Sequence, residues 1–177
     1  MDSDDDKRRP APARPYQPTT AQLHIPRMAL EASVSLLQRA GRRESGVLWY
    51  GTRDTSGSGI VKYVVAPPQT MAPRNYHVAA DALTEIVSRL PDDWKALAQV
   101  HSHPGIRVEH SRYDDRMASS RRALSLVFPL YGNLREPFPT GIGIHEFQID
   151  YWHLLDDATA SQRVVICDGS VKIEDLR

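Results

Sequence analysis

Two histidines that end an apolar run are the residues of this 177-residue chain best suited to chemistry. His101 and His103 follow the strand-length segment 94–100, and a proline stops the strand directly after them. Because residues two apart in an extended chain point to the same side, both imidazoles can face one point. Ser111 and Asp114 come further along, at a spacing that puts a hydroxyl and a carboxylate on one face of a helical turn. The pattern predicts a metal site.

The number of candidate ligands indicates the kind of metal site. His101, His103 and Asp114 supply two imidazoles and one carboxylate, and catalytic zinc sites use three protein ligands and leave the fourth position to water. A closed structural zinc site needs four protein ligands, usually including cysteines, and this chain has a single cysteine, Cys167. We therefore expect a site for hydrolysis rather than a structural zinc site.

An acidic residue at the start of another apolar segment is a candidate for the base that hydrolysis needs. Glu44 precedes the run 45–50, which has the length and composition of a buried strand. A carboxylate at the mouth of such a strand is costly unless it is paired or hydrogen-bonded. Glu44 therefore either lies at the rim in water or is held near a cation or near the metal and its water.

Taken together, these segments resemble the JAMM (MPN-plus) metallopeptidases. The motif His-Ser-His-Pro from His101 is followed after six residues by Ser111-x-x-Asp114, and Glu-Ser-Gly-Val-Leu-Trp-Tyr-Gly from Glu44 is similar to the prokaryotic branch of the family. The resemblance covers roughly residues 22–155. It implies that His101, His103 and Asp114 ligate Zn²⁺, that Glu44 is the general base that later protonates the leaving amine, and that Ser111 helps to hold the oxyanion.

The resemblance also implies a substrate and partners. Relatives of this kind cut the C-terminal tail of a ubiquitin-like modifier from a lysine side chain or from a short extension, and they commonly accompany activating and conjugating enzymes, including in phage defence. A second enzymatic possibility is the trimming of a sulfur-carrier precursor. A third is an MPN scaffold that binds a partner without cutting. A nucleobase deaminase, which shares the layout of sheet and helices, is disfavoured because its His-x-Glu and Pro-Cys-x-x-Cys ligands are absent.

Each candidate residue also has a simpler interpretation. The pair Ser111 and Asp114 alone is more often a helix capping box, and both roles can hold together. The connecting residues Glu109 and His110 are expected to face solvent, because three ligands are already supplied. The other histidines lie on or beside expected strands and are interpreted as structural: His24, His77, His145 and His153. Two tryptophans are expected to pack in or near the core, and the cysteine to be inert: Trp49, Trp152 and Cys167.

Composition restricts the remaining function classes. Twenty-two basic residues balance 22 acidic ones, so the totals indicate neither a nucleic-acid nor an anionic-membrane partner. No apolar run approaches the ~20 residues of a membrane helix. A lone cysteine without an apparent secretory signal fits the reducing cytoplasm, where we expect the protein to act.

The length predicts one domain, over residues 21–177. The resemblance implies that this domain is an α/β domain of the MPN/JAB type, with a curved mixed β-sheet flanked by helices. The charged, proline-rich residues 1–20 are expected to form a flexible tail. Periodicity predicts helices over 27–40, 79–90 and 111–120. It predicts strands over 21–25, 44–50, 60–65, 76–78, 94–103, 123–129 and 141–152, and a closing hairpin of 163–167 with 171–173. Segments 66–75 and 132–140 are expected to be loops that flank the site.

Overall fold

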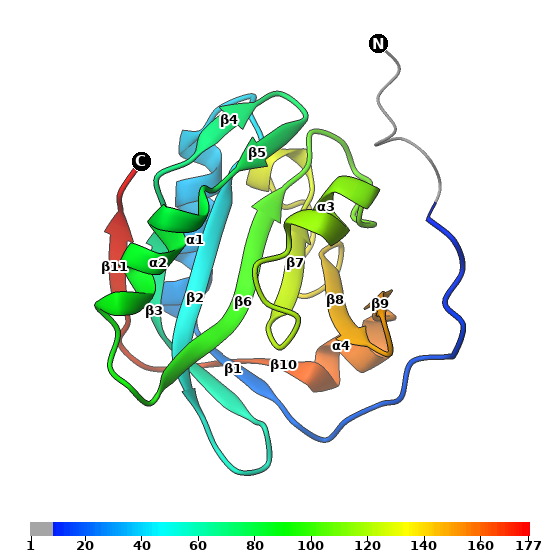
Figure 1. Cartoon of the computed structure of the whole chain (residues 1–177). Coiled ribbons are helices and arrows are strands. Elements are labelled where there is room, and N and C mark those ends of the chain that lie inside the picture. Colours follow the sequence, from blue (N-terminus) through cyan, green and yellow to red (C-terminus); the bar gives the residue numbers. More distant parts are fainter. Residues whose placement is uncertain (1–8) are drawn as a thin grey trace.

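The computed structural model describes residues 9–177, whose elements alternate between strands and short helices (Figure 1). The helices are α1 (Arg27–Arg39), α2 (Ala80–Ser88), α3 (Arg112–Met117), α4 (Asp157–Arg163) and the 3₁₀ turn η2 (Leu130–Gly132). The strands are β1 (Leu23–Pro26), β2 (Gly46–Arg53), β3 (Gly59–Ala66), β4 (Thr70–Ala72), β5 (Asn75–His77), β6 (Trp94–Ser102), β7 (Leu124–Phe128), β8 (Gly143–Gln148), β9 (Tyr151–Leu154), β10 (Val164–Cys167) and β11 (Lys172–Asp175).

Within the described chain, nine strands form one curled, mixed sheet in the order β10-β1-β3-β2-β6-β7-β8-β9, with β11 also paired to β3. The pairs β1–β10, β1–β3, β11–β3 and β6–β7 are parallel, and the remaining neighbours in this sheet are antiparallel. The register of β2 shifts at Tyr50 against both β3 and β6, and such irregularities increase the local twist of a sheet. Gly51 lies at this point because a Cβ there would come within 2.0 Å of the Ile60 carbonyl oxygen.

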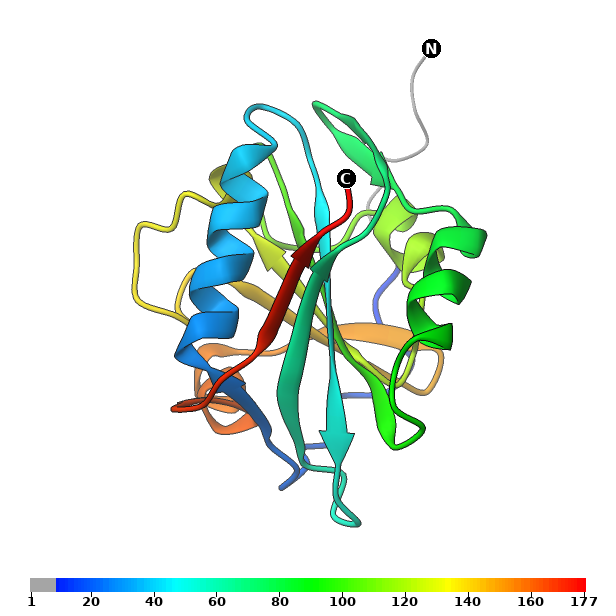
Figure 2. The same ribbon diagram turned by 90° about the vertical axis from the view of Figure 1, so that its left-hand side faces the viewer.

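Helices cover both faces of the sheet (Figure 2): α1 packs on one side of the strands, and α2 with α3 lies on the other. Side chains of β2 alternate between the two layers, with Trp49 in the α1 cluster and Leu48 in the cluster that includes Ile86 of α2. The Trp49 indole nitrogen donates a hydrogen bond of 2.8 Å to Ser33 Oγ on α1. The predicted core position of Trp49 is therefore confirmed.

The structure corrects the prediction of one strand over residues 141–152. The chain turns at Ile149 and Asp150, which have φ angles of +47° and +61°, and β8 pairs back with β9 as an antiparallel hairpin. Two successive residues with positive φ form the type of tight turn that matches strand twist, but glycine or asparagine normally signals it. The Ile-Asp pair carries no such signal, so the turn was missed.

The structure also corrects the predicted closing hairpin. The segments 163–167 and 171–173 do not pair with each other: β10 lies parallel to β1, and β11 lies parallel to β3. The turn residues between these two segments predicted that the segments pair with each other. Instead, four residues of each strand pair with a strand that is distant in the sequence. Helix α4 was not predicted, although Asp156 caps it by accepting a hydrogen bond of 2.7 Å from the Thr159 amide.

The N-terminal segment was expected to be a flexible tail. Its first eight residues lie outside the described part of the chain, and residues 9–20 run along the domain without a helix or strand. The segment has partners on the domain, among them Asp115 for Arg9 and Glu146 for Tyr16. Flexibility of residues 1–20 therefore stays a prediction. No helix in residues 9–177 combines the length and apolarity needed to cross a membrane.

Candidate metal centre

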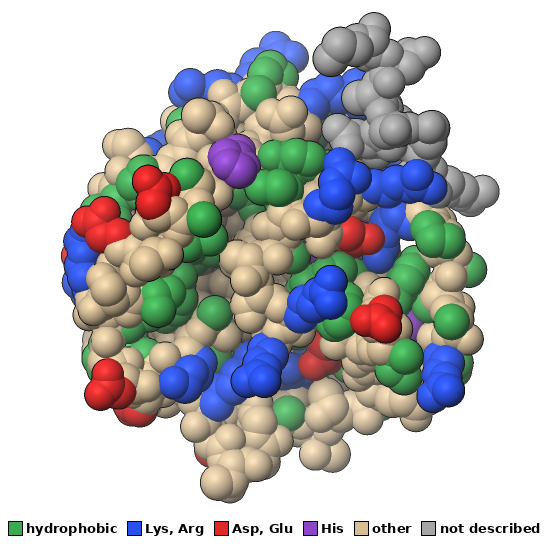
Figure 3. All heavy atoms as spheres, in the orientation of Figure 1, with side chains coloured by type: hydrophobic (Ala, Val, Ile, Leu, Met, Phe, Trp, Pro, Cys, Tyr) green, Lys and Arg blue, Asp and Glu red, His purple; other side chains and the backbone are tan. Residues whose placement is uncertain are grey.

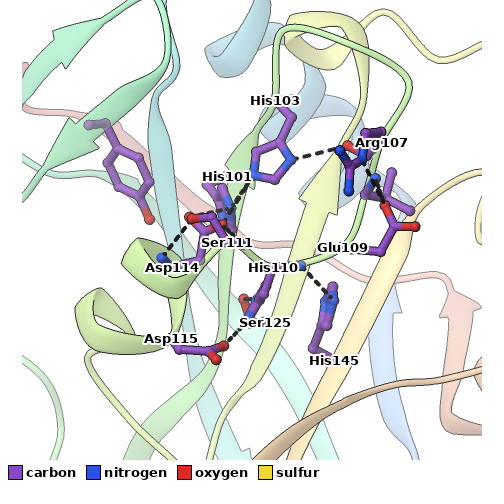
Figure 4. Close-up of polar contacts among 12 residues, drawn as sticks. His101, His103, Arg107, Glu109, His110, Ser111, Asp114, Asp115, Ser125 and His145 are labelled. Atoms are coloured by element: carbon purple, nitrogen blue, oxygen red, sulfur yellow. Dashed lines mark hydrogen bonds and ion pairs between the residues drawn. The ribbon is translucent and has the colours of Figure 1, made fainter. Parts of the chain in front are cut away.

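The two histidines lie at the C-terminal end of the central strand β6. His101 pairs with Gly46 of β2 and Val127 of β7, and its side chain is buried. His103 lies just past the strand, where its amide donates to the Phe128 carbonyl at 2.8 Å, so the extended backbone continues. The two Nε2 atoms lie 3.2 Å apart, as the alternation of side chains predicts (Figure 4).

Helix α3 carries the third candidate ligand, the carboxylate of Asp114. Ser111 caps the helix, because its Oγ accepts a hydrogen bond from the Asp114 amide at 3.1 Å and its own amide donates to Asp114 Oδ2 at 2.6 Å. Asp114 Oδ1 lies 3.3 Å from His101 Nε2, and Oδ2 lies 3.3 Å from His103 Nε2. The capping box and the ligand geometry are therefore both present in the same pair of residues.

The three residues lie close enough together to share one metal ion. His101, His103 and Asp114 form a group that could hold a metal ion. Ligands about 2.0–2.1 Å from a tetrahedral zinc ion are about 3.3–3.4 Å from one another. The two Nε2 atoms, 3.2 Å apart, are close to that spacing, and each lies 3.3 Å from a different carboxylate oxygen of Asp114. Two imidazole nitrogens and a carboxylate also form a donor set that suits zinc.

The electrostatics of the three residues favour positive charge between them. Burial alone would raise the pKa of Asp114, but the facing His101 and His103 outweigh burial and hold that pKa well below its usual value. Burial also acts to lower the pKa of His103, and Asp114 with Glu44 more than offsets it, so this pKa is raised. The group therefore attracts cations, and a bound metal ion would supply the charge in place of protons.

Glu44 lies at the same end of the sheet, just before β2, and only 6% of its surface is exposed. Burial raises its pKa to about 7; His103 and Arg74 oppose the rise, and Asp114 adds to it. The sequence left two positions open for Glu44, one at the rim in water and one held near charged groups. The structure shows the second, because Glu44 is buried and lies near His103, Asp114 and Arg74. A carboxyl group with a pKa near neutrality can both take up and release a proton at working pH.

The raised pKa of Glu44 predicts that the stability of the metal-free protein depends on pH. Because the folded state binds this proton more tightly than the unfolded state, the free energy of unfolding falls as the pH rises from the usual value of 4.5 to about 7, and it is level above. With chelator present, Glu44→Gln is expected to raise the free energy of unfolding by ~2 kcal/mol at about pH 8 and to change it little at about pH 4. Urea denaturation at both pH values measures this difference, and equal stabilities at about pH 8 would contradict the prediction.

A comparison with known protein families matches the part of the chain that holds the candidate metal centre. A family model described as prokaryotic homologs of the JAB domain matches residues 26–137, which hold Glu44, both histidines, Ser111 and Asp114. The chain belongs to this family. The prokaryotic JAB family includes metallopeptidases, and a His-His-Asp group is compatible with that chemistry.

A solved structure shares the fold. The solution structure of protein DSY2949 from Desulfitobacterium hafniense superposes with a TM-score of 0.63 at 18% identity, covering 84% of this chain and 95% of that one. A JAB1/MPN domain protein from Archaeoglobus fulgidus gives a TM-score of 0.43 at 16% identity, over 70% and 88% of the two chains. The similarity to the Desulfitobacterium hafniense protein shows a shared fold alone. A search of curated proteins finds no match. The family match over residues 26–137 and the mixed sheet flanked by helices confirm the predicted α/β JAB fold.

A small hairpin of this JAB domain lies beside the centre, where the sequence predicted a loop over 66–75. Strand β4 pairs with β5 as a separate two-stranded sheet, and the Ala72 carbonyl accepts a hydrogen bond of 2.8 Å from the Glu44 amide. The Tyr131 hydroxyl donates to the Pro73 carbonyl at 3.0 Å, and the Tyr113 hydroxyl donates to the Tyr76 carbonyl at 2.9 Å. The hairpin is thus attached to Glu44, to α3 and to η2.

Sequence reasoning missed two tyrosines of this arrangement. The Tyr76 ring lies 5.6 Å from that of His101, and Tyr131 sits in the left-handed region with a φ of 56° while its amide donates to the His103 carbonyl at 2.8 Å. Pro73 and Asn75, residue types that favour turns, were a usable signal for a turn at this place. Nothing local marked Tyr131, because its partners lie far away in the sequence.

The structure corrects the interpretation of His110 as solvent-facing. Only 5% of His110 is exposed, its Nδ1 lies 2.9 Å from Asp115 Oδ1, and its Nε2 lies 2.8 Å from Ser125 Oγ (Figure 4). Its ring stacks on His145 at 3.8 Å, and burial lowers its pKa well below the usual value. His110 therefore belongs to a buried layer behind the candidate ligands, whereas Glu109 is exposed as expected.

Proposed function

We propose that this JAB-domain protein is a zinc-dependent isopeptidase or peptidase that cuts after the C-terminal tail of a ubiquitin-like modifier. The observation that carries the proposal is the convergence of His101, His103 and Asp114 at 3.2–3.3 Å beside the buried carboxyl of Glu44. A scaffold would not need three metal-ligating side chains with their ligand atoms within 4.8 Å of one another, together with a proton acceptor whose pKa is near 7.

Each residue has a distinct part in this chemistry. His101, His103 and Asp114 would hold a zinc ion, which when bound would supply a Lewis acid and lower the pKa of a water molecule toward neutrality. Glu44 takes the proton of the attacking water and returns it to the departing nitrogen. The Ser111 hydroxyl accepts from the Asp114 amide and donates no hydrogen bond to another described residue, so its proton is available to the oxyanion.

The substrate is expected to bind in extended form. The hairpin β4–β5 presents short strands beside the centre, and an extended tail can add to a strand edge through main-chain hydrogen bonds. The flanking segments 66–75 and 132–140 would then set specificity.

The proposal also includes partners and a setting. The partners are the conjugating and activating enzymes of a modifier system, and the setting is phage defence in the cytoplasm. The face in Figure 3 carries interspersed acidic and basic side chains rather than one basic stripe.

Attachment of the hairpin through Tyr131 gives a prediction about substrate binding. Tyr131→Phe removes the hydroxyl that donates to the Pro73 carbonyl at 3.0 Å, and one such hydrogen bond is worth about 1 kcal/mol. We expect KM to rise about fivefold while kcat and zinc content stay within about twofold. Steady-state kinetics with a modifier fusion as substrate measure KM and kcat separately. Tyr63→Phe, which removes a hydroxyl contact to Glu174 away from the centre, is the control, and equal KM values for the two variants would contradict the prediction.

One experiment separates the functions under consideration. The purified protein is incubated with fusions of candidate ubiquitin-like proteins to a reporter, linked either linearly or through a lysine isopeptide bond, with and without chelator. Cleavage that chelator abolishes and zinc restores supports the proposal, and the linkage that is cut distinguishes deconjugation from trimming of a sulfur-carrier precursor. Tight binding of a modifier without stoichiometric zinc and without cleavage would show that the protein is a scaffold.

A further inference from the structure

The first described residues of the chain reach the helix that carries a candidate metal ligand. Arg9 Nε donates to Asp115 Oδ2 at 2.7 Å, and its Nη2 donates to the Trp152 carbonyl of β9 at 2.9 Å. The guanidinium also lies 4.4 Å from the centre of the Tyr151 ring, and only 11% of the arginine side chain is exposed. Arg9 is therefore docked on the domain through its charge, its hydrogen bonds and its flat face.

The same segment is fixed independently at its other end. The Tyr16 hydroxyl donates to Glu146 Oε2 at 2.5 Å, and the main chain of Gln17 exchanges two hydrogen bonds of 2.9 Å with the Gln148 side chain. Both partners belong to β8. This second attachment holds the segment to the sheet without touching α3, so the two ends can be tested separately.

Helix α3 depends on polar contacts for its position. It has six residues, and the only one of them that is fully buried is Asp114 itself, so no apolar side chain anchors it deeply. Asp115, the next residue, contacts Arg9 on one side. On its other side Asp115 contacts His110, and His110 in turn contacts Ser125 of β7 (Figure 4). A continuous polar chain thus links the N-terminal segment to the sheet through the residue beside the candidate ligand.

We propose that Arg9 is a positioning residue for the metal centre. Through Asp115 it holds α3 in the orientation that keeps the Asp114 carboxylate opposite the two imidazoles. This inference rests on the proposed zinc site, and it goes beyond it by giving the N-terminal segment a part in metal binding. Groups that orient a ligand without touching the metal typically change metal affinity by about 10- to 100-fold.

The test is the zinc dissociation constant, measured by competition with a chelating dye on the full-length protein. Arg9→Ala is expected to weaken zinc binding about tenfold. Tyr16→Phe, the matched control on the same segment, is expected to leave zinc affinity within about twofold of the wild type, because its partner Glu146 is on β8. The melting temperature of each metal-free variant reports whether the segment still stabilises the fold. A purely structural role for Arg9 would lower this temperature and leave zinc affinity unchanged.

A double-variant cycle tests the route through Asp115. If Arg9 acts through that carboxylate, Arg9→Ala adds nothing further to the loss of affinity in an Asp115→Ala background. Fully additive losses would overturn the proposed route. An Arg9→Ala affinity equal to that of the wild type would overturn the inference and leave the zinc site standing. A wild-type protein that binds no stoichiometric zinc would overturn the proposed function and this inference with it.

Discussion

Glu44→Gln is expected to lower kcat by about 10²- to 10⁴-fold and to leave the zinc content at one ion per chain. Glutamine has nearly the same shape, but it cannot accept the proton of the attacking water or return it to the leaving nitrogen. The raised pKa of about 7 makes the wild-type carboxyl suited to both steps, and the loss therefore falls on catalysis. Cleavage of a modifier fusion at saturating substrate, together with metal analysis of the same sample, measures the effect.

Glu109→Gln is the matched control for this variant. Glu109 is an exposed acid on the loop that leads from the histidines to α3, so the same substitution removes an acid near the candidate ligands in the sequence without removing a buried one. Its kcat is expected to stay within about twofold of the wild type. Undiminished cleavage by the Glu44 variant would show that another group, or none, acts as the base.

Asp114→Asn is expected to abolish tight zinc binding and, with it, activity. Asparagine can still accept the hydrogen bond from the Ser111 amide, so the cap of α3 is largely kept, but the charged carboxylate, whose two oxygens each face one imidazole, is lost. A ligand that binds only the folded state at a thousand times its dissociation constant stabilises it by about 4 kcal/mol. Zinc should therefore raise the melting temperature of the wild type by about 8–16 °C and that of the variant hardly at all.

Calorimetry with and without zinc measures this difference, and Asp54→Asn provides the control. Asp54 is an exposed carboxylate in the β2–β3 turn, at the other end of β2 from the metal centre, and it also accepts local hydrogen bonds. That variant should keep the full zinc-induced shift. A comparable shift in Asp114→Asn would mean that the stabilising ion binds elsewhere.

Local patterns were sufficient for most of the elements. The three- and four-residue spacing of apolar side chains predicted α1, which is observed over Arg27–Arg39, and the apolar run before the histidines predicted β6. Helix α3 proved shorter than the expected segment 111–120 and ends at Met117. Strand partners were predicted less well, because a strand's period shows which faces are buried and not which other strand lies beside it.

The sequence alone determined which side chains could form the centre. The alternation of an extended chain places His101 and His103 on one side, and one helical turn places Asp114 beside Ser111, so these relations involve only neighbouring residues. Tertiary structure alone decided that α3 brings Asp114 against the imidazoles, that the hairpin β4–β5 lies against Glu44, and that Arg9 reaches Asp115. Those contacts join distant segments, and they depend on packing across the whole sheet, which no local spacing encodes.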